Sequence, residues 1–206
     1  MTTDRPATPI LRGPGSTASR ASTEEAFLDA AERLLITVGY AGITTRLVAE
    51  EARTNHGLVH YYFGSMDNLF VRVLERFTER LIARQREMYG ADVPFLEKWR
   101  QAIRYLDMDR RYQKVWLEFQ ALSWNRPHLR ERVAAVNGEW RAVLTEAFAA
   151  PRDELGIEMP LDALVSLVMT LNEGIILERL SGVETGHGEL LDWIDGWLQR
   201  RQAESG

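Results

Sequence analysis

Residues 44–69 read TTRLVAEEARTNHGLVHYYFGSMDNL, and this stretch decides the fold. It predicts a helix of about seven residues capped by Thr44 or Thr45, then a short turn, then a second helix capped by Thr54 or Asn55. Two such short helices bury little apolar surface by themselves, so they must pack on a third helix. This arrangement is a helix-turn-helix, whose second helix enters the major groove of DNA.

The second of these helices carries side chains suited to contact with a nucleic acid. Asn55, His56, Gly57, His60 and Tyr61 are small, polar or aromatic. Asparagine and histidine can hydrogen-bond to base edges, tyrosine can donate to a phosphate, and glycine lets the backbone approach closely. The stretch therefore predicts contact with double-stranded DNA.

Helical periodicity continues on both sides of this stretch. Upstream, apolar residues at spacings of three and four predict a helix that begins at a cap from Ser22 or Thr23 and ends at Gly39. Downstream, Ser65 caps a helix expected to reach about Met88, which is long enough to join two lobes. Further apolar stripes predict helices over residues 95–106, 115–122, 129–147, 161–181 and 188–202. No alternating pattern predicts a strand, so the expected fold class is all-α.

The composition narrows the class of protein further. The 206 residues are 45% hydrophobic and 27% charged, which excludes fibrous and extensively disordered classes. The absence of cysteine excludes disulfides, thiolate metal sites, iron–sulfur clusters and cysteine nucleophiles. Since no apolar run approaches the roughly 18 residues of a membrane span and no signal-peptide core is present, we expect a cytoplasmic protein with no membrane partner. Proline and glycine gather in residues 1–21, which we expect to form a disordered arm.

The order of short motifs between Ala26 and about Leu74 resembles the tetracycline-repressor (TetR) family of bacterial transcriptional regulators. The motifs, in chain order, are Gly39-Tyr40 after the first apolar stripe, Thr44-Thr45-Arg46, Val48-Ala49, Ala52 at the turn, Tyr62-Phe63, Gly64-Ser65 and Leu69. The resemblance implies nine or so helices, with a helix-turn-helix DNA-binding domain over residues 22–68. It implies that residues 69–206 form a ligand-binding and dimerisation domain.

The resemblance also implies roles for individual residues. Thr44 would cap a helix beside a phosphate, and Thr45 and Arg46 would reach DNA from the start of that helix. The other residues to which we assign DNA contact are Asn55, His56, Gly57, Leu58, His60, Tyr61, Tyr62 and Ser65. The chain departs from the family pattern in the turn, where Arg53-Thr54 stands in place of the usual Gly-Val. Either Arg53 adopts a left-handed conformation at a cost of about 1 kcal/mol, or the turn differs.

Large apolar side chains are abundant beyond residue 90. Core packing explains most of them, but their number also predicts a pocket for a small, mostly apolar or aromatic effector. Two polar residues interrupt an apolar stretch there and could orient a ligand or pin a dimer contact. The candidate pocket residues are Trp99, Tyr105, Met108, Trp116, Phe119, Trp140, Met169, Asn172 and Glu173.

The last two predicted helices carry apolar stripes, and a single helix-turn-helix reads only half of a two-fold site. A homodimer that packs these helices into a four-helix bundle would explain both features and would bind a palindromic operator. The candidate interface residues are Leu164, Val168, Leu171, Ile175, Leu191, Ile194 and Trp197, although each can equally serve the core of its own protomer.

Two other classes of protein are alternatives to a DNA-binding regulator. An enzyme is disfavoured, because the sequence has no phosphate-binding loop, no Gly-x-Ser-x-Gly elbow and no cysteine. His56 and His60 have the spacing of two metal ligands, but no third ligand is near in sequence, so we expect no metal and no cofactor. The other rival is an all-α interaction module, or a small-molecule-binding protein, that does not bind DNA.

The net charge of −5 argues against a protein that coats nucleic acid through bulk charge. Residues 1–68 alone contain six arginines, no lysine and eight acidic residues, a net charge of −2. We therefore expect DNA binding through a few placed contacts, with a shallow salt dependence and weak non-specific affinity. Arg5, Arg12 and Arg20 lie in the expected arm, from which they could reach DNA.

Overall fold

The computed structural model describes the backbone of residues 17–205 and the side chains of residues 20–204. All regular structure in this part of the chain is helical, which confirms the all-α prediction. The elements are α1 (Thr17–Thr37), a single 3₁₀ turn (Tyr40–Gly42), α2 (Thr45–Glu51), α3 (Gly57–Phe63), α4 (Met66–Gly90), α5 (Phe95–Met108), α6 (Arg110–Ser123), α7 (Pro127–Glu154), α8 (Leu161–Leu180) and α9 (His187–Ser205).

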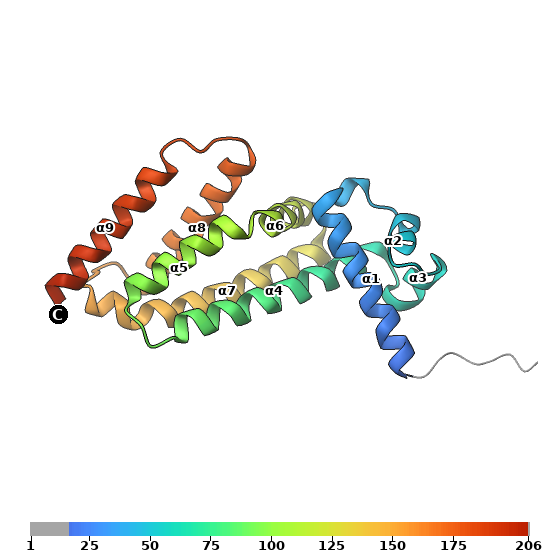
Figure 1. Cartoon of the computed structure of the whole chain (residues 1–206), viewed down its shortest axis with the longest axis horizontal. Coiled ribbons are helices and arrows are strands. Elements are labelled where there is room, and N and C mark those ends of the chain that lie inside the picture. Colours follow the sequence, from blue (N-terminus) through green and yellow to red (C-terminus); the bar gives the residue numbers. More distant parts are fainter. Residues whose placement is uncertain (1–16, 206) are drawn as a thin grey trace, which may run out of the picture.

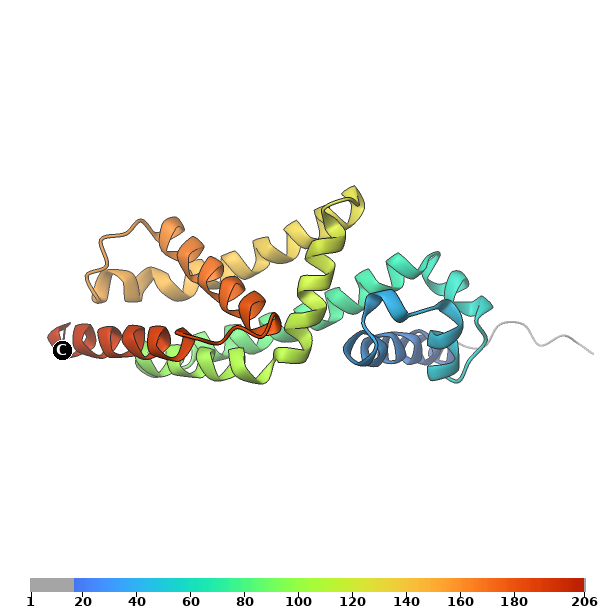
Figure 2. The ribbon, with the colours of Figure 1, turned by 90° about the horizontal axis from the view of Figure 1, so that it is seen from above.

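The helices form an elongated molecule (Figure 1). The three N-terminal helices lie at one end, and α8 and α9 lie towards the other end. Between them, α4 runs from the N-terminal helices deep into the larger bundle, where α7 packs beside it (Figures 1 and 2). The long helix predicted from Met66 therefore does join the two parts. None of the described helices is both long and apolar enough to cross a membrane.

Side-chain caps fix the beginnings of the short helices. The Thr44 hydroxyl accepts a hydrogen bond from the Leu47 amide at 3.1 Å, and the Ser65 hydroxyl accepts one from the Asn68 amide at 3.1 Å. Asn55 accepts from the Gly57 amide at 2.9 Å at the start of α3. These bonds satisfy amides that the first turn of a helix leaves without partners. The predicted caps at Thr44 and Ser65 are confirmed.

Two helix ends differ from the sequence prediction. Helix α1 begins at Thr17, so residues 17–21 are helical although they were expected in a disordered arm; residues 1–16, with Arg5 and Arg12, lie outside the described residues. Helix α7 continues through Pro151 to Glu154, where a loop was expected. The Pro151 carbonyl accepts from the Leu155 amide at 2.9 Å, and Leu155 is only 6% exposed. Burial of Leu155 thus holds this last turn in place.

The buried core of the N-terminal helices extends into the second half of the chain. Val115 and Phe119 of α6 belong to the same buried cluster as residues of α1 to α4. Phe119 is 1% exposed, and its ring centroid lies 6.4 Å from that of Tyr40. Helix α6 is therefore part of the platform on which the helix-turn-helix rests.

The turn between α2 and α3 contains Arg53 with φ = +54°, which confirms the left-handed alternative. A side chain with a Cβ atom is strained in this conformation by about 1 kcal/mol or more. Arg53 is exposed and has no ion-pair partner among the described residues, so its replacement removes no internal contact.

We predict that Arg53→Gly raises the free energy of unfolding by up to about 1 kcal/mol, because glycine adopts this conformation without strain. Thermal unfolding should show a midpoint roughly 2–4 °C higher. Arg53→Ala is the matched control, since alanine loses the charge but keeps the Cβ atom. An equal gain for both variants would contradict the assignment of strain to the backbone.

Candidate DNA-binding surface and ligand cavity

Helix α3 has one buried face and one exposed face. Val59 and Phe63 point into the core, at 0% and 8% exposure. The residues that the sequence assigned to DNA are exposed: Leu58, His60 and Tyr61 on α3, Gly57 at its start, and Asn55 and His56 just before it. The candidate recognition surface is therefore available on the outside of the protein.

The other residues predicted to contact DNA differ in their exposure. Thr44 and Arg46 are exposed, and Arg46 forms an ion pair with Glu50 at 2.8 Å; Thr45 and Ser65 are half-buried. Tyr62 is also half-buried, and its ring centroid lies 6.1 Å from that of Phe27 in the core. Tyr62 thus contributes to packing beneath the surface.

One basic residue joins this surface from an unexpected element. The Arg20 guanidinium lies 5.0 Å from the centroid of the Tyr61 ring, within the range of a cation–π contact. The sequence predicts Arg20 in a disordered arm, because the predicted cap of the first helix is Ser22 or Thr23. The earlier start of α1 brings Arg20 beside α3.

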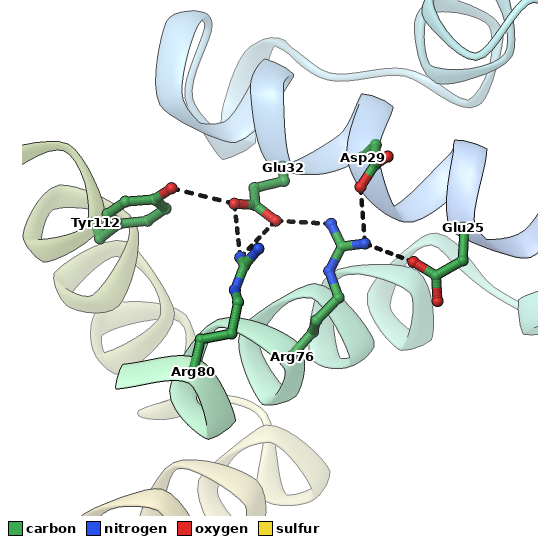
Figure 3. A network of polar contacts seen from close by, with 6 residues as sticks. All are labelled: Glu25, Asp29, Glu32, Arg76, Arg80 and Tyr112. Carbon is green, nitrogen blue, oxygen red and sulfur yellow. Dashed lines mark hydrogen bonds and ion pairs between the residues drawn. The ribbon is translucent and has the colours of Figure 1, made fainter. Parts of the chain in front are cut away.

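Three acidic residues of α1 form ion pairs with arginines of α4 (Figure 3). The Arg76 guanidinium contacts Glu25 at 2.9 Å, Asp29 at 2.8 Å and Glu32 at 2.7 Å. Arg80 adds a second ion pair with Glu32 at 2.7 Å. The remaining paired acids of this region are Glu50 with Arg46, Glu51 with Arg33 and Asp67 with Arg126. The negative charge counted in the sequence is therefore largely paired within the protein.

Tyr112 of α6 connects this network to the interior of the larger bundle. Its hydroxyl donates to Glu32 at 3.3 Å, and its ring stacks on Phe77 with centroids 4.3 Å apart (Figure 3). Burial raises the pKa of the Tyr112 hydroxyl, and the charge of Glu32 raises it further, so the hydroxyl stays protonated as a donor. A single side chain thus reaches from α1 to the wall of a cavity.

That cavity has a volume of about 160 Å³ and is bounded by α4 to α8. The structure brings seven predicted residues together in its lining: Trp99, Tyr105, Trp116, Trp140, Met169, Asn172 and Glu173. It does not bring Met108 or Phe119 there. Met108 is 71% exposed at the end of α5, and Phe119 faces the N-terminal core. The residues that the sequence missed include Phe77 and Gln85 of α4, which had been interpreted only as a connecting helix.

Most residues predicted for a dimer interface are buried within the protomer. Leu164, Val168, Ile175 and Leu191 are at most 9% exposed. The other three, Leu171, Ile194 and Trp197, are half-buried against the same internal clusters. The exposed uncharged face of α8 consists of Ala163, Leu167, Thr170, Gly174 and Leu177, and α9 adds Leu190 and Trp193. The exposed residues of α8 recur at spacings of three and four, as the buried residues do. The sequence pattern therefore could not distinguish the exposed face from the buried face.

Comparisons with known proteins agree with this architecture. The sequence profile of the bacterial regulatory proteins of the tetR family matches residues 27–73. The HTH-type transcriptional repressor SCO4008 of Streptomyces coelicolor is 28% identical over 164 residues, which cover 73% of this chain and 77% of that protein.

Two solved structures have the same fold. One is a transcriptional regulator of Saccharomonospora viridis in complex with choline, with a TM-score of 0.71, 20% identity, and coverage of 88% of this chain and 95% of that one. The other is the transcriptional regulator FadR of Bacillus subtilis in complex with stearoyl-CoA, with a TM-score of 0.68, 14% identity, and coverage of 84% and 96%. The profile match over residues 27–73, the curated relative and the shared fold all agree with the resemblance to the TetR family of bacterial regulatory proteins.

Proposed function

We propose that this protein is a ligand-responsive transcriptional repressor that binds DNA through α3 and releases it when a small molecule occupies the cavity. The observation that carries the proposal is the exposed face of α3, together with the pairing of Glu25, Asp29 and Glu32 of α1 with arginines of α4. The basic side chains Arg20, Arg53, His56 and His60 are exposed at or beside α3, where DNA can approach them. The curated relatives are transcriptional repressors, so catalysis has no part in the proposal.

The repressor would act as a homodimer on a palindromic operator. One helix-turn-helix reads one half-site, and two-fold symmetry of the protein matches two-fold symmetry of the DNA. The exposed faces of α8 and α9 are the best candidates for the contact between protomers, because five exposed residues of α8 are uncharged and the large apolar Leu190 and Trp193 are exposed on α9. Two copies of this helix pair would form a four-helix bundle.

Release would follow from a change in the distance between the two copies of α3. A ligand that fits the cavity better at one distance shifts the population of dimers towards that distance. Helix α4 lines the cavity with Phe77 and contacts α1 through Arg76 and Arg80, while Tyr112 contacts α1 from α6. These contacts give the ligand a direct mechanical route to the DNA-binding helices. We expect the protein to act in the cytoplasm, where its operator lies.

Selection of genomic fragments by the full-length protein tests this function. We expect enrichment of a palindromic sequence, and we expect the His56→Glu, His60→Glu double variant to lose it, because both side chains are exposed and the change adds negative charge towards DNA. Circular dichroism would establish that the double variant is folded. No enrichment over scrambled DNA by the folded wild-type protein would reject the repressor and favour a binding module without DNA.

A further inference from the structure

The cavity is lined by an unusual number of aromatic rings. Its wall includes three tryptophans, three tyrosines and a phenylalanine: Trp99, Trp116, Trp140, Tyr89, Tyr105, Tyr112 and Phe77. The faces of aromatic rings carry partial negative charge, and tryptophan attracts a cation most strongly. A cavity with this wall discriminates between ligands by charge as well as by size.

The charged residues of the lining have one sign. Asp109 and Glu173 are acidic, and none of the described residues that line the cavity is lysine, arginine or histidine. Asp109 forms an ion pair with Arg84, which lies behind the wall. Glu173 accepts a hydrogen bond from the Gln120 amide at 2.9 Å, but no described cation lies within ion-pair distance of it. The lining therefore holds one carboxylate that lacks a positive partner.

Polar groups without internal partners also face this space. Gln85 of α4 lines the cavity and is 7% exposed, yet its amide has no hydrogen-bond partner among the described residues. Asn137 and Asn172 line the same cavity, also without such a partner. A buried amide is normally hydrogen-bonded, so these groups are available to a polar atom of a ligand.

A cation already contacts both an aromatic ring and a carboxylate at one side of the cavity. The Arg84 guanidinium lies 4.1 Å from the centroid of the Tyr105 ring while it is paired with Asp109. A cation is thus held between an aromatic face and a carboxylate. Glu173 and the tryptophans offer the same two kinds of group within the lining, with no protein cation between them.

We propose that the cavity binds an organic monocation, such as a quaternary ammonium group attached to an aromatic ring, with Glu173 and the tryptophan faces holding the charge. A negatively charged ligand would meet an unpaired carboxylate, and a neutral apolar one would remove Glu173 from water without compensation. The volume is close to that of apolar cavities, near 150 Å³, that hold benzene, which favours a ligand with a single ring. This inference rests on the proposal that the cavity is the effector site.

A pair of probes that differ only in charge tests the inference. Benzyltrimethylammonium and its neutral carbon isostere 2,2-dimethylpropylbenzene have nearly the same shape. We expect the cation to bind the full-length protein about tenfold or more tightly, measured by quenching of tryptophan fluorescence and by calorimetry. The three tryptophans of the lining provide the optical signal.

Variants assign the preference to named groups. Glu173→Gln keeps the shape of the side chain and should weaken cation binding about tenfold. It should not weaken binding of the neutral probe, because an amide costs less to remove from water than a carboxylate. Trp140→Leu should likewise weaken the cation more than the neutral probe. Glu146→Gln is the matched control, because Glu146 is exposed on α7 and has no charged partner among the described residues; it should change neither affinity.

The outcomes separate this inference from the proposed function. Equal affinity for the two probes, no effect of Glu173→Gln, or no binding of the cation to a folded protein would overturn the ligand class. Enrichment of a palindromic operator in the same preparation would then leave the repressor standing. Conversely, cation binding that depends on Glu173, without enrichment of any DNA sequence, would support the ligand class and reject the repressor.

Discussion

Replacement of Glu32 by alanine is expected to lower the free energy of unfolding by about 2–3 kcal/mol. The Glu32 carboxylate accepts hydrogen bonds from Arg76, Arg80 and Tyr112, and its side chain is only 13% exposed. Charge-assisted hydrogen bonds to partly buried groups contribute more than exposed ion pairs. The expected loss is smaller than for a fully buried pair, because Arg80 is half-exposed and Arg76 keeps its contacts with Asp29 and Glu25.

Thermal and denaturant unfolding measure this loss. A decrease of 2–3 kcal/mol in a chain of this size lowers the thermal midpoint by about 4–12 °C. Glu51→Ala is the matched control: Glu51 also pairs with an arginine of α1 across 2.7 Å, but both side chains are well exposed. An exposed pair contributes about 1 kcal/mol or less. Equal destabilisation by the two variants would show that the Glu32 network does not tie α1 to α4.

The sequence alone could not predict which acidic residues take part in the Glu32 network. Arg76 and Glu32 are 44 residues apart, and Tyr112 and Glu32 are 80 apart. A count of charges along residues 1–68 could not tell which acids face DNA and which face α4. Local features were predictable, because a cap such as Thr44 or Ser65 interacts within its own first turn.

The lining of the cavity was also only partly predictable from the sequence. The sequence identified seven of its residues by their type. Five are large apolar or aromatic side chains, whose number beyond residue 90 exceeded what a small core requires, and two are polar residues that interrupt an apolar stretch. It could not tell Phe119, which faces the N-terminal core, from Trp116 one turn earlier, which lines the cavity. It also missed Gln85, since a single glutamine on a long helix is ordinarily a surface residue.

The apolar residues of α8 illustrate why faces were confused. Val168 is 9% exposed and Leu167 is 52% exposed, although they are neighbours in the chain and both are aliphatic. A helix that is apolar on most sides has no polar face to fix its orientation. Only the packing of α6 and α7 against α8 decides which stripe is internal, and that information is not local.

Gly57→Ala is expected to separate DNA binding from folding. Gly57 has a helical conformation, and an added Cβ atom would lie 3.4 Å from the Asn55 side-chain oxygen, an ordinary contact. Alanine favours a helix over glycine, so the variant should be at least as stable as the wild type. The fold therefore does not require glycine at this position.

A methyl group at the start of α3 would nevertheless stand between the backbone and the DNA. If the loss resembles that of one mismatched base pair, about 1–3 kcal/mol per half-site, a dimer on a palindrome loses about 2–6 kcal/mol. This corresponds to an affinity at least about 30-fold weaker for the selected operator, measured by titration with labelled DNA at fixed salt.

Gly138→Ala provides the matched control for this experiment. Gly138 is an exposed glycine within α7, and a Cβ atom there meets nothing within 4 Å. The two variants should gain similar helix stability, yet only Gly57→Ala should weaken operator binding. If both variants bind the operator like the wild type, the start of α3 does not approach DNA closely. In that case the specificity must come from the longer side chains of the exposed face, His60 and Tyr61, reaching the bases from a more distant backbone.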